Sequence, residues 1–288
     1  MSATVQLTYS IPPPDGSKTY TVVNRDSITG ERTQSWKEDV RSVQIEDVRG
    51  KENEYTLDTA GFQFFRHPTK HTRFLDDAEI KAEYYPETAE LIKKLTGATE
   101  VVLFEHTVRR RRPGLIDDGP QKRQPVLVIH ADQTTPDAFV RFHKHLPPKD
   151  PAHPRRGRFQ TMNLWRPISH PAIDSPLAIC DYRSVNADED LLPATLIYAA
   201  REGDIYYAKY NPKHRWVYKS DMDTADLVLM KSFDSILDGS VAGLALHTGF
   251  ELPEVPEGTP MRESIEIEAL VYYEGDQVGG QLLSTYTN

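Results

Sequence analysis

One histidine and one carboxylate stand two residues apart in the segment His130-Ala131-Asp132. On a strand the side chains alternate between faces, so positions 130 and 132 point to the same side. A second histidine elsewhere would complete a three-ligand set that holds a divalent metal on one face and leaves the opposite face open. An isolated pair of this kind is more often a hydrogen-bonded histidine beside a turn-initiating aspartate. The residues downstream therefore decide its meaning.

Two histidines compete for the third position. His247 follows the short apolar run Leu244-Ala245-Leu246, whereas His214 lies in a polar turn after Asn211-Pro212-Lys213. We favour His247, because an arginine suited to anion binding follows it closely, and keep His214 as the rival. His247 comes 115 residues after Asp132, so the intervening chain must return beside the first strand. Two histidines and one carboxylate form the ligand set of non-haem Fe(II) oxygenases.

Arg262 and Ser264 follow His247 and open a strand expected over residues 264–273. Two positions apart, their side chains share a face. The guanidinium of Arg262 can bind a carboxylate through two parallel hydrogen bonds, and the hydroxyl of Ser264 can add a third. The alternative for Arg262 is a surface ion pair with one of the nearby glutamates.

Composition narrows the class of protein. The chain has 288 residues, 38% of them hydrophobic and 27% charged, with a net charge of −9. The acidic balance argues against a nucleic-acid groove as the main function. Cys180 is the single cysteine, no signal peptide is visible, and the apolar stretch 191–200 is too short to span a bilayer. We expect a cytoplasmic protein with a small-molecule substrate and neither a membrane nor a nucleic acid as partner.

Several common functional motifs are missing from the sequence. It has no Gly-x-Gly-x-x-Gly turn, Gly-x-Ser-x-Gly elbow or Cys-x-x-Cys pair. Nucleotide-binding, α/β-hydrolase and zinc-finger functions therefore lose their usual support.

The elements that must position these residues are mainly strands. Runs rich in β-branched and aromatic residues, separated by turn signals, predict strands over 3–10, 18–24, 42–46, 59–65, 101–104, 125–130, 158–167, 176–183, 204–210, 215–219, 226–233, 243–247 and 264–273. Helices are expected over 75–85, 86–96 and 136–145, the last with Thr135 as its N-cap. Many strands, few helices and no repeats predict a mainly β fold with flanking helices, a jelly roll or barrel.

Two further groups of residues each allow two interpretations. Asn163 and Trp165 share one face of the strand 158–167, where they would line a cofactor or substrate or belong to the core. The run Arg109–Arg112 could bind an anion, but a solvated loop before the first strand of the core is the favoured interpretation.

The order of these motifs resembles the Fe(II)/2-oxoglutarate-dependent oxygenases, and in particular a fungal hydroxylase/desaturase family. That family includes relatives of a cephalosporin methoxylation subunit and of a fungal gibberellin desaturase. The resemblance covers roughly residues 55–275 and is specific in combination. It is carried by residues 130–134, 163–167, 180–185, 211–216, 231–235 and 262–266.

The resemblance implies a double-stranded β-helix, with Fe(II), 2-oxoglutarate and O₂ as cofactor and co-substrates. His130, Asp132 and His247 match the iron ligands, and Arg262 matches the 2-oxoglutarate anchor with Ser264 beside it. We expect a single domain over 1–288, with 1–100 flanking the core, 101–275 forming the β-helix and 276–288 a tail.

The activity that the resemblance implies is oxidative tailoring of a small-molecule secondary metabolite by hydroxylation, desaturation or oxidative ring closure. Two alternatives stay open. One is a cupin-like metal-dependent dioxygenase or isomerase that does not use 2-oxoglutarate. The other is a non-catalytic β-roll that binds a ligand without turnover.

Overall fold

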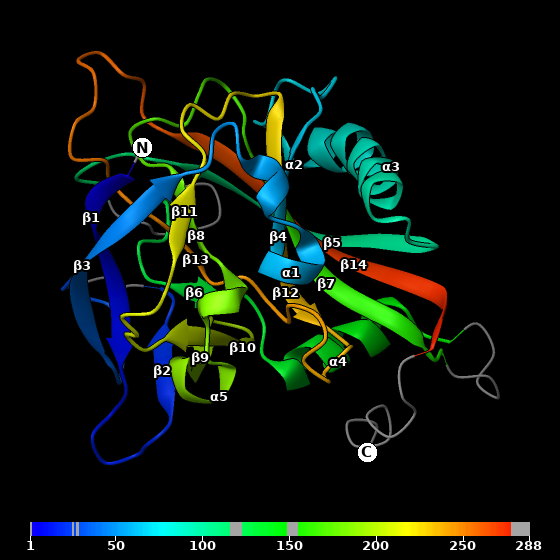
Figure 1. Cartoon of the computed structure of the whole chain (residues 1–288), viewed down its shortest axis with the longest axis horizontal. Helices are drawn as coiled ribbons and strands as arrows, with labels where there is room; N and C mark the ends of the chain where they lie inside the picture. The colour runs from blue at the N-terminus through cyan, green and yellow to red at the C-terminus, as the bar shows by residue number, and fades with distance from the viewer. Residues whose placement is uncertain (1, 25, 27–28, 116–122, 149–154, 278–288) are drawn as a thin grey trace.

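Two β-sheets form the centre of the fold, which we describe from a computed structural model (Figure 1). The structure describes the chain except residues 1, 25, 27–28, 116–122, 149–154 and 278–288. Among the described residues, one sheet has nine strands in the order β1-β3-β11-β8-β13-β6-β10-β9-β2, and the other has five in the order β4-β12-β7-β14-β5. The predicted mainly β fold with flanking helices is confirmed. Most of the expected tail 276–288 lies outside the described residues.

The larger sheet contains β1 (Ser2–Ile11), β2 (Thr19–Val22), β3 (Lys37–Asp47), β6 (His130–Ala131), β8 (Leu177–Cys180), β9 (Leu191–Ile197), β10 (Glu202–Ala208), β11 (Trp216–Tyr218) and β13 (His247–Gly249). The smaller sheet contains β4 (Phe62–Arg66), β5 (Glu100–Arg110), β7 (Gly157–Pro167), β12 (Asp226–Asp234) and β14 (Glu263–Gln277). The helices are α1 (Leu57–Ala60), α2 (Asp77–Glu79), α3 (Tyr85–Thr96), α4 (Thr135–His145) and α5 (Ala187–Asp190). A π-helical turn, Ile80–Tyr84, joins α2 to α3, and short 3₁₀ turns cover Glu52–Glu54 and Tyr182–Ser184.

The larger sheet curls until its first strand meets the segment before β6. Thr8 of β1 forms a parallel bridge with Val128, and the backbone N–H of Ile129 donates to the carbonyl of Thr8 at 3.0 Å. An apolar cluster that includes Leu7, Ile129 and Trp216 packs on the strands of this curl. Such closure fixes the strand that carries His130 against the rest of the sheet.

A second core lies between the two sheets. Phe62 of β4, Trp165 of β7 and Met230 of β12 pack there against Ile179 of β8 and Val217 of β11. Each of these side chains contributes about 1.5–3 kcal/mol of burial free energy. The packing holds the two sheets face to face, so residues from β7 and β14 come close to residues from β6 and β13.

Helices cover the smaller sheet. Leu91 and Ile92 of α3 pack against apolar residues of β7, β12 and β14, and Phe139 and Phe142 of α4 pack against Phe159 of β7 (Figure 1). Side chains alternate along β7, so Met162 and Leu164 under α3 point to one face and Phe159 under α4 points to the other. α3 therefore covers the outer face of the smaller sheet, and α4 covers one end of the inner face, which also carries Asn163 and Trp165.

Several sequence-based predictions about individual elements are wrong. The N-cap of α4 is Thr134 rather than Thr135, because the Thr134 side chain accepts from the backbone N–H of Asp137. The predicted strand 125–130 is reduced to β6, and the strand expected over 243–247 begins only at His247. The apolar stretch 191–200 contains β9, which the sequence did not predict as a strand.

The first two predicted strands are present as β1 and β2, and each pairs with a strand from elsewhere in the chain. β1 pairs with β3, and β2 pairs in parallel with β9. Turn residues show only where the chain reverses. They do not show which strands are neighbours in the sheet, so the pairing of β1 and β2 could not be predicted from the turn between them.

The arginine run is not a solvated loop. Arg109 and Arg110 belong to β5, and the whole run from Arg109 to Arg112 is half-buried. β5 is an edge strand, and its end pairs with a later segment, since the backbone N–H of Arg110 donates to the carbonyl of Arg123 at 3.0 Å.

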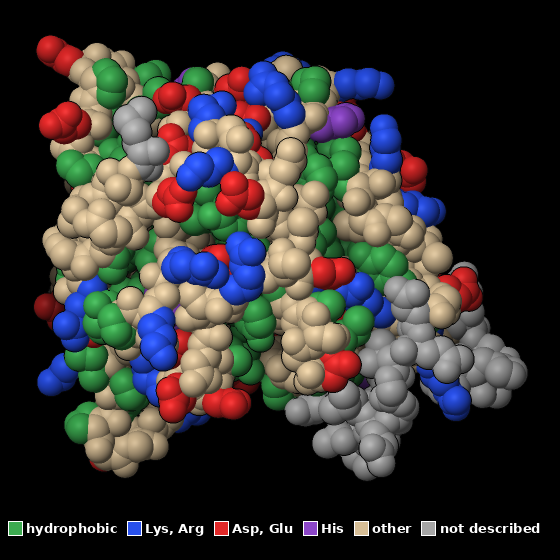
Figure 2. Space-filling view, in the orientation of Figure 1, with side chains coloured by type: hydrophobic (Ala, Val, Ile, Leu, Met, Phe, Trp, Pro, Cys, Tyr) green, Lys and Arg blue, Asp and Glu red, His purple; other side chains and the backbone are tan. Residues whose placement is uncertain are grey.

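Charged side chains of both signs are mixed on the face of the molecule seen in Figure 2. On its described part, neither Lys and Arg nor Asp and Glu form a continuous patch. Among the described helices, none combines the length and apolar character that crossing a bilayer requires.

Candidate functional site

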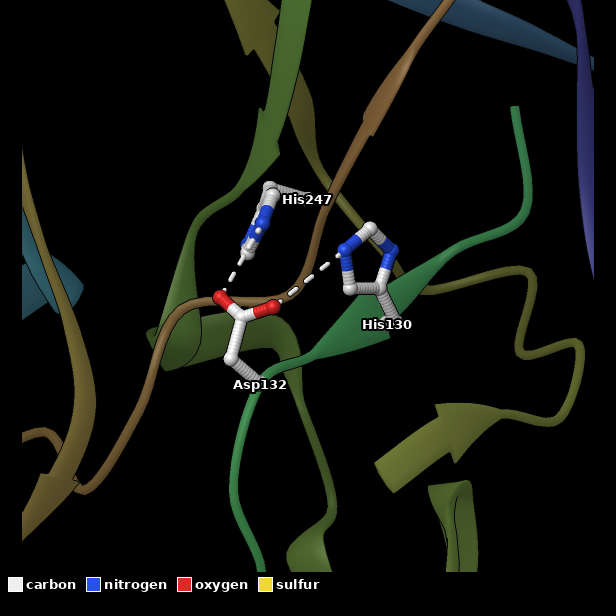
Figure 3. A group of neighbouring side chains, drawn as sticks. All are labelled: His130, Asp132 and His247. Atoms are coloured by element: carbon white, nitrogen blue, oxygen red, sulfur yellow. Dashed lines mark ion pairs between the residues drawn. The ribbon is translucent and has the colours of Figure 1, made fainter. Parts of the chain in front are cut away.

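β6 and β13 bring His130 and His247 together. The two residues stand directly opposite in antiparallel register, and side chains so paired have Cβ atoms about 5 Å apart on one face. Asp132 follows two residues after His130 and points to the same side. The ligand atoms of the three residues all lie within 4.8 Å of one another. Figure 3 shows the three side chains turned toward one another. Strand pairing therefore joins two parts of the chain that are far apart in sequence.

Backbone carbonyls orient both imidazole rings. Nδ1 of His130 lies 2.7 Å from the carbonyl oxygen of Val128, and Nδ1 of His247 lies 3.1 Å from that of Ala245. A carbonyl oxygen only accepts, so Nδ1 carries the proton and Nε2 keeps its lone pair. Each Nε2 lies 3.5 Å from a carboxylate oxygen of Asp132. This is the tautomer and orientation that a metal-ligating histidine needs.

The donor atoms of this cluster fit a divalent cation. Nε2 of His247 is buried and has no hydrogen-bond partner. Burial, together with the facing His247, lowers the pKa of His130 to about 3, so its ring is neutral at pH 7. Neutral imidazoles and one carboxylate are the protonation states that bind a metal, and this ligand set suits iron.

Asn163 of β7 holds the carboxylate of Asp132. Its Nδ2 donates to Asp132 and also, at 2.9 Å, to Glu266 of β14, while Oγ of Ser232 donates to its Oδ1 at 3.3 Å. Glu266 lies 3.9 Å from Nε2 of His247. The sequence predicts Asn163 as a cofactor-binding residue, and the structure places it against the aspartate of the candidate metal site.

Arg262 lies buried beside this cluster with its charge unpaired. Its Nη1 donates to the carbonyl of Ser175 at 2.8 Å, its Nε has no partner, and its guanidinium carbon is 5.4 Å from the ring centre of Trp165. Among the described residues, no carboxylate forms an ion pair with its side chain. Burial lowers the pKa of Arg262 to about 9, assisted by the nearby Arg109, which leaves it cationic at pH 7. A buried unpaired cation is costly, so its surroundings suit an anionic ligand.

A small cavity of about 10 Å³ separates Arg262 from the two histidines and is also lined by Trp165. Gly249 lies at its edge, where an added Cβ would meet Nη1 of Arg262 at 3.2 Å and the carbonyl oxygen of Val126 at 3.1 Å. Glycine therefore preserves the space next to the guanidinium. Ser264 is buried on β14 but is not among the residues that line this cavity.

A much larger cavity of about 820 Å³ opens from His130 and Asp132. Glu266 and Glu268 of β14 line it on the side of the smaller sheet. Burial, together with the charge of Asp132, raises the pKa of Glu268 to about 8, although Arg141 at 3.6 Å opposes the shift. The volume is that of a pocket for a drug-sized molecule.

His214 belongs to a different cluster. Its Nε2 lies 3.0 Å from Asp190 and its Nδ1 lies 3.2 Å from the hydroxyl of Tyr9. Asn211 donates to both oxygens of Asp190 at 3.1 Å. The structure thus uses both ring nitrogens of His214 in structural hydrogen bonds, and His247 alone of the two rivals joins His130 and Asp132.

Sequence reasoning missed Glu266, Arg109 and Gly249. Glu266 and Glu268 alternate with apolar residues on β14, which is buried over much of its length. Acidic residues at every second position of such a strand are costly unless they have partners or a function, and that pattern was a usable signal. Gly249 carries no comparable signal, and the signal at Arg109 was the arginine run itself, for which a solvated loop was the favoured interpretation.

Comparison with known proteins gives consistent matches. A family model described as "Oxidoreductase/YMDC permease-like domain" matches residues 7–272. The hydroxylase/desaturase efuI of Hormonema carpetanum is 33% identical over 262 residues, covering 84% of this chain and 86% of the relative. The Fe(II)/2-oxoglutarate-dependent dioxygenase nvfI of Aspergillus novofumigatus is 30% identical over 237 residues, covering 80% and 82%.

A solved structure supports the same relationship. The iron and alpha-ketoglutarate-dependent endoperoxidase NvfI superposes with a TM-score of 0.80 at 25% sequence identity, covering 95% of this chain and 98% of the other. The predicted jelly roll, or double-stranded β-helix, is thereby confirmed. The predicted family and its cofactor requirement are confirmed as well. The chain belongs to the family of fungal hydroxylase/desaturases and Fe(II)/2-oxoglutarate-dependent dioxygenases.

Proposed function

We propose that His130, Asp132 and His247 hold Fe(II), that Arg262 binds the far carboxylate of 2-oxoglutarate, and that the large cavity takes a small-molecule secondary metabolite for oxidation. One observation carries the assignment. Two fixed imidazoles and one carboxylate converge within 4.8 Å, next to a buried arginine without an ion-pair partner. A metal site and an anion site side by side are what an iron enzyme with a dicarboxylate co-substrate requires.

The residues of the chain orient and enclose the reactants. When bound, iron and 2-oxoglutarate supply oxygen activation coupled to decarboxylation of 2-oxoglutarate to succinate. Hydrogen bonds to Val128 and Ala245 keep the imidazoles pointed at Asp132, and Asn163 keeps the carboxylate turned toward them. The small cavity holds about one water molecule, so 2-oxoglutarate requires a shift of the side chains that line it.

The names of the relatives support oxidation at carbon as the class of reaction. Hydroxylation, desaturation and oxidative ring closure all begin with removal of a hydrogen atom from a substrate placed near the metal. The pocket wall formed by Glu266 and Glu268 gives this chain polar groups next to that position. Ser264, expected beside Arg262, is buried on β14 and lines neither cavity, so it has no part in this proposal.

Arg262 separates this function from a metal-dependent enzyme that does not use 2-oxoglutarate. Removing one partner of a buried charged pair costs about 2–5 kcal/mol, so Arg262→Ala is expected to weaken 2-oxoglutarate binding by roughly 30-fold or more. Anaerobic calorimetry with Mn(II) in place of iron measures this directly. An unchanged affinity would remove Arg262 from the co-substrate site.

Metal content separates the proposed enzyme from a β-roll that only binds a ligand. We expect purified wild-type protein and His214→Ala to take up one equivalent of Fe(II), and His130→Ala to take up much less. Succinate release that depends on Fe(II) and O₂ then shows turnover. Equal iron in wild type and His130→Ala contradicts the ligand set.

A further inference from the structure

The large cavity extends from the metal site along β5 to the arginine run Arg109–Arg112. Its volume of about 820 Å³ lies in the range of pockets that bury a whole drug-sized ligand. Since 2-oxoglutarate has only ten non-hydrogen atoms, most of this space is left for the substrate. The following inference rests on the proposed function and concerns what that substrate carries.

Within the run, three arginines already have carboxylate partners. Arg109 lies 3.9 Å from Glu266, Arg110 lies 3.4 Å from Glu263, and Arg111 pairs with Glu251 and, at 2.9 Å, with Asp174. Arg112 differs from them. Its Nε and Nη2 are buried and have no hydrogen-bond partner.

The backbone of Arg112 is held in place although its side chain is unpartnered. The side chain of Gln124 accepts from the backbone N–H of Arg112 at 2.8 Å and donates to its carbonyl oxygen at 2.7 Å. Buried donors without acceptors are rare in folded proteins, because each loses its hydrogen bonds to water. With its backbone anchored and its Nε and Nη2 unpartnered, the Arg112 guanidinium is available to an anion, and a carboxylate fits its fork with two hydrogen bonds.

Apolar side chains also line this cavity. Leu75, Leu115 and Leu127 all line it and are 78%, 61% and 46% exposed. Large apolar side chains gathered in the exposed part of a pocket mark a surface for an apolar ligand. The cavity therefore offers an apolar wall next to an unpaired cation.

We propose that the substrate is an organic acid with a large apolar body, and that Arg112 binds its carboxylate. Arg112 lies three residues beyond Arg109, which lines the small cavity next to His130. Three residues of fully extended chain span at most about 10 Å, so the backbone of Arg112 lies within roughly that distance of Arg109 along the cavity wall. A substrate held there reaches the metal site with the end opposite its acid group.

The test compares acids with their own methyl esters. Dodecanoic acid, 2-naphthoic acid and dehydroabietic acid serve as probes, each paired with its ester. Binding is measured by calorimetry with Mn(II) and saturating 2-oxoglutarate, so that the co-substrate site is filled and no turnover occurs. We expect wild type to bind at least one acid tenfold or more tightly than its ester.

Variants assign the preference to Arg112. In Arg112→Gln the acid-to-ester ratio falls below twofold, and Arg112→Lys retains part of it. Arg73→Gln is the matched control, since Arg73 is an exposed arginine paired with Glu79 that does not line the cavity. This control keeps the wild-type ratio.

Three outcomes overturn the proposal. They are no preference for any acid in wild type, an unchanged preference in Arg112→Gln, and a loss of 2-oxoglutarate binding in Arg112→Gln, which would assign Arg112 to the co-substrate. Failure of the proposed function itself is visible earlier, because wild type would then bind neither Mn(II) nor 2-oxoglutarate.

Discussion

Replacing Asn163 tests whether the polar residues behind Asp132 set the metal affinity. Asn163 is 1% exposed and donates to two carboxylates, those of Asp132 and Glu266. Asn163→Leu keeps the number and branching of the side-chain heavy atoms and removes both hydrogen bonds. Asp132 would then be free to turn away from the two histidines, and Glu266 would lose its fixed position.

The expected magnitude follows from these contacts. Hydrogen bonds to charged groups contribute about 1.5–3 kcal/mol each, and loss of residues that orient metal ligands typically costs 10–100-fold in metal affinity. We expect the Kd for Fe(II) to rise about 30-fold in Asn163→Leu. By linkage, this removes about 2 kcal/mol of the stabilisation that saturating metal gives. At about 2–4 °C per kcal/mol, the metal-induced rise in Tm shrinks by about 4–8 °C.

Anaerobic calorimetry gives the affinity, and thermal unfolding with and without Mn(II) gives the shift. Asn211→Leu is the matched control, because Asn211 also donates to a buried carboxylate, that of Asp190, away from the metal site. The control is expected to lower Tm equally with and without metal. An Asn163→Leu protein that folds and keeps its Kd within twofold would refute the reasoning.

Three further predictions concern other parts of the molecule. Gly249→Ala places a methyl group against Nη1 of Arg262. We therefore expect the affinity for 2-oxoglutarate to fall at least tenfold while the affinity for Mn(II) stays unchanged. Calorimetry that shows both affinities unchanged would contradict this. His214→Ala breaks buried hydrogen bonds, including that to Asp190. We expect urea titrations to show a free energy of unfolding lower by about 2–4 kcal/mol, with no loss of bound iron. A loss of iron would indicate that His214 is a metal ligand. Burial raises the pKa of Glu268 above its unfolded value, so wild-type stability is full below the unfolded pKa and falls as pH rises toward about 8. Glu268→Gln should flatten that decline in the metal-free protein, and parallel urea profiles between pH 5 and pH 9 would contradict the shift.

Arg112 and Asn163 are assigned to different parts of one site, Arg112 to substrate binding and Asn163 to metal binding. Asn163 acts through the aspartate of the metal site and should not alter the acid-to-ester preference. Arg112 acts on the substrate and should not alter metal affinity. Measuring both quantities in both variants therefore shows whether the two ends of the cavity are independent.

Sequence patterns with a short range predicted the local elements well. Apolar and polar alternation located β7, β12 and β14, and the His-x-Asp spacing placed His130 and Asp132 on one side. These patterns misplaced a helix boundary that depends on one hydrogen bond, the N-cap at Thr134. They also do not identify the strands that pair with β1 and β2, because those strands are distant in the sequence. A loop is the usual expectation for four adjacent arginines, because such charges are normally solvated. Here Arg109 and Arg110 belong to the edge strand β5, and three of the four arginines pair with carboxylates.

The sequence by itself determined which chemistry was available: a His-x-Asp pair, later histidines and an Arg-x-Ser pair that together resemble one oxygenase family. The tertiary structure decided which groups meet. It placed His247 directly opposite His130 in the sheet, turned His214 toward Asp190, and set Asn163 and Glu266 of the second sheet behind the aspartate. The reason is that strand register and sheet packing join residues more than a hundred positions apart, through contacts that no local periodicity encodes.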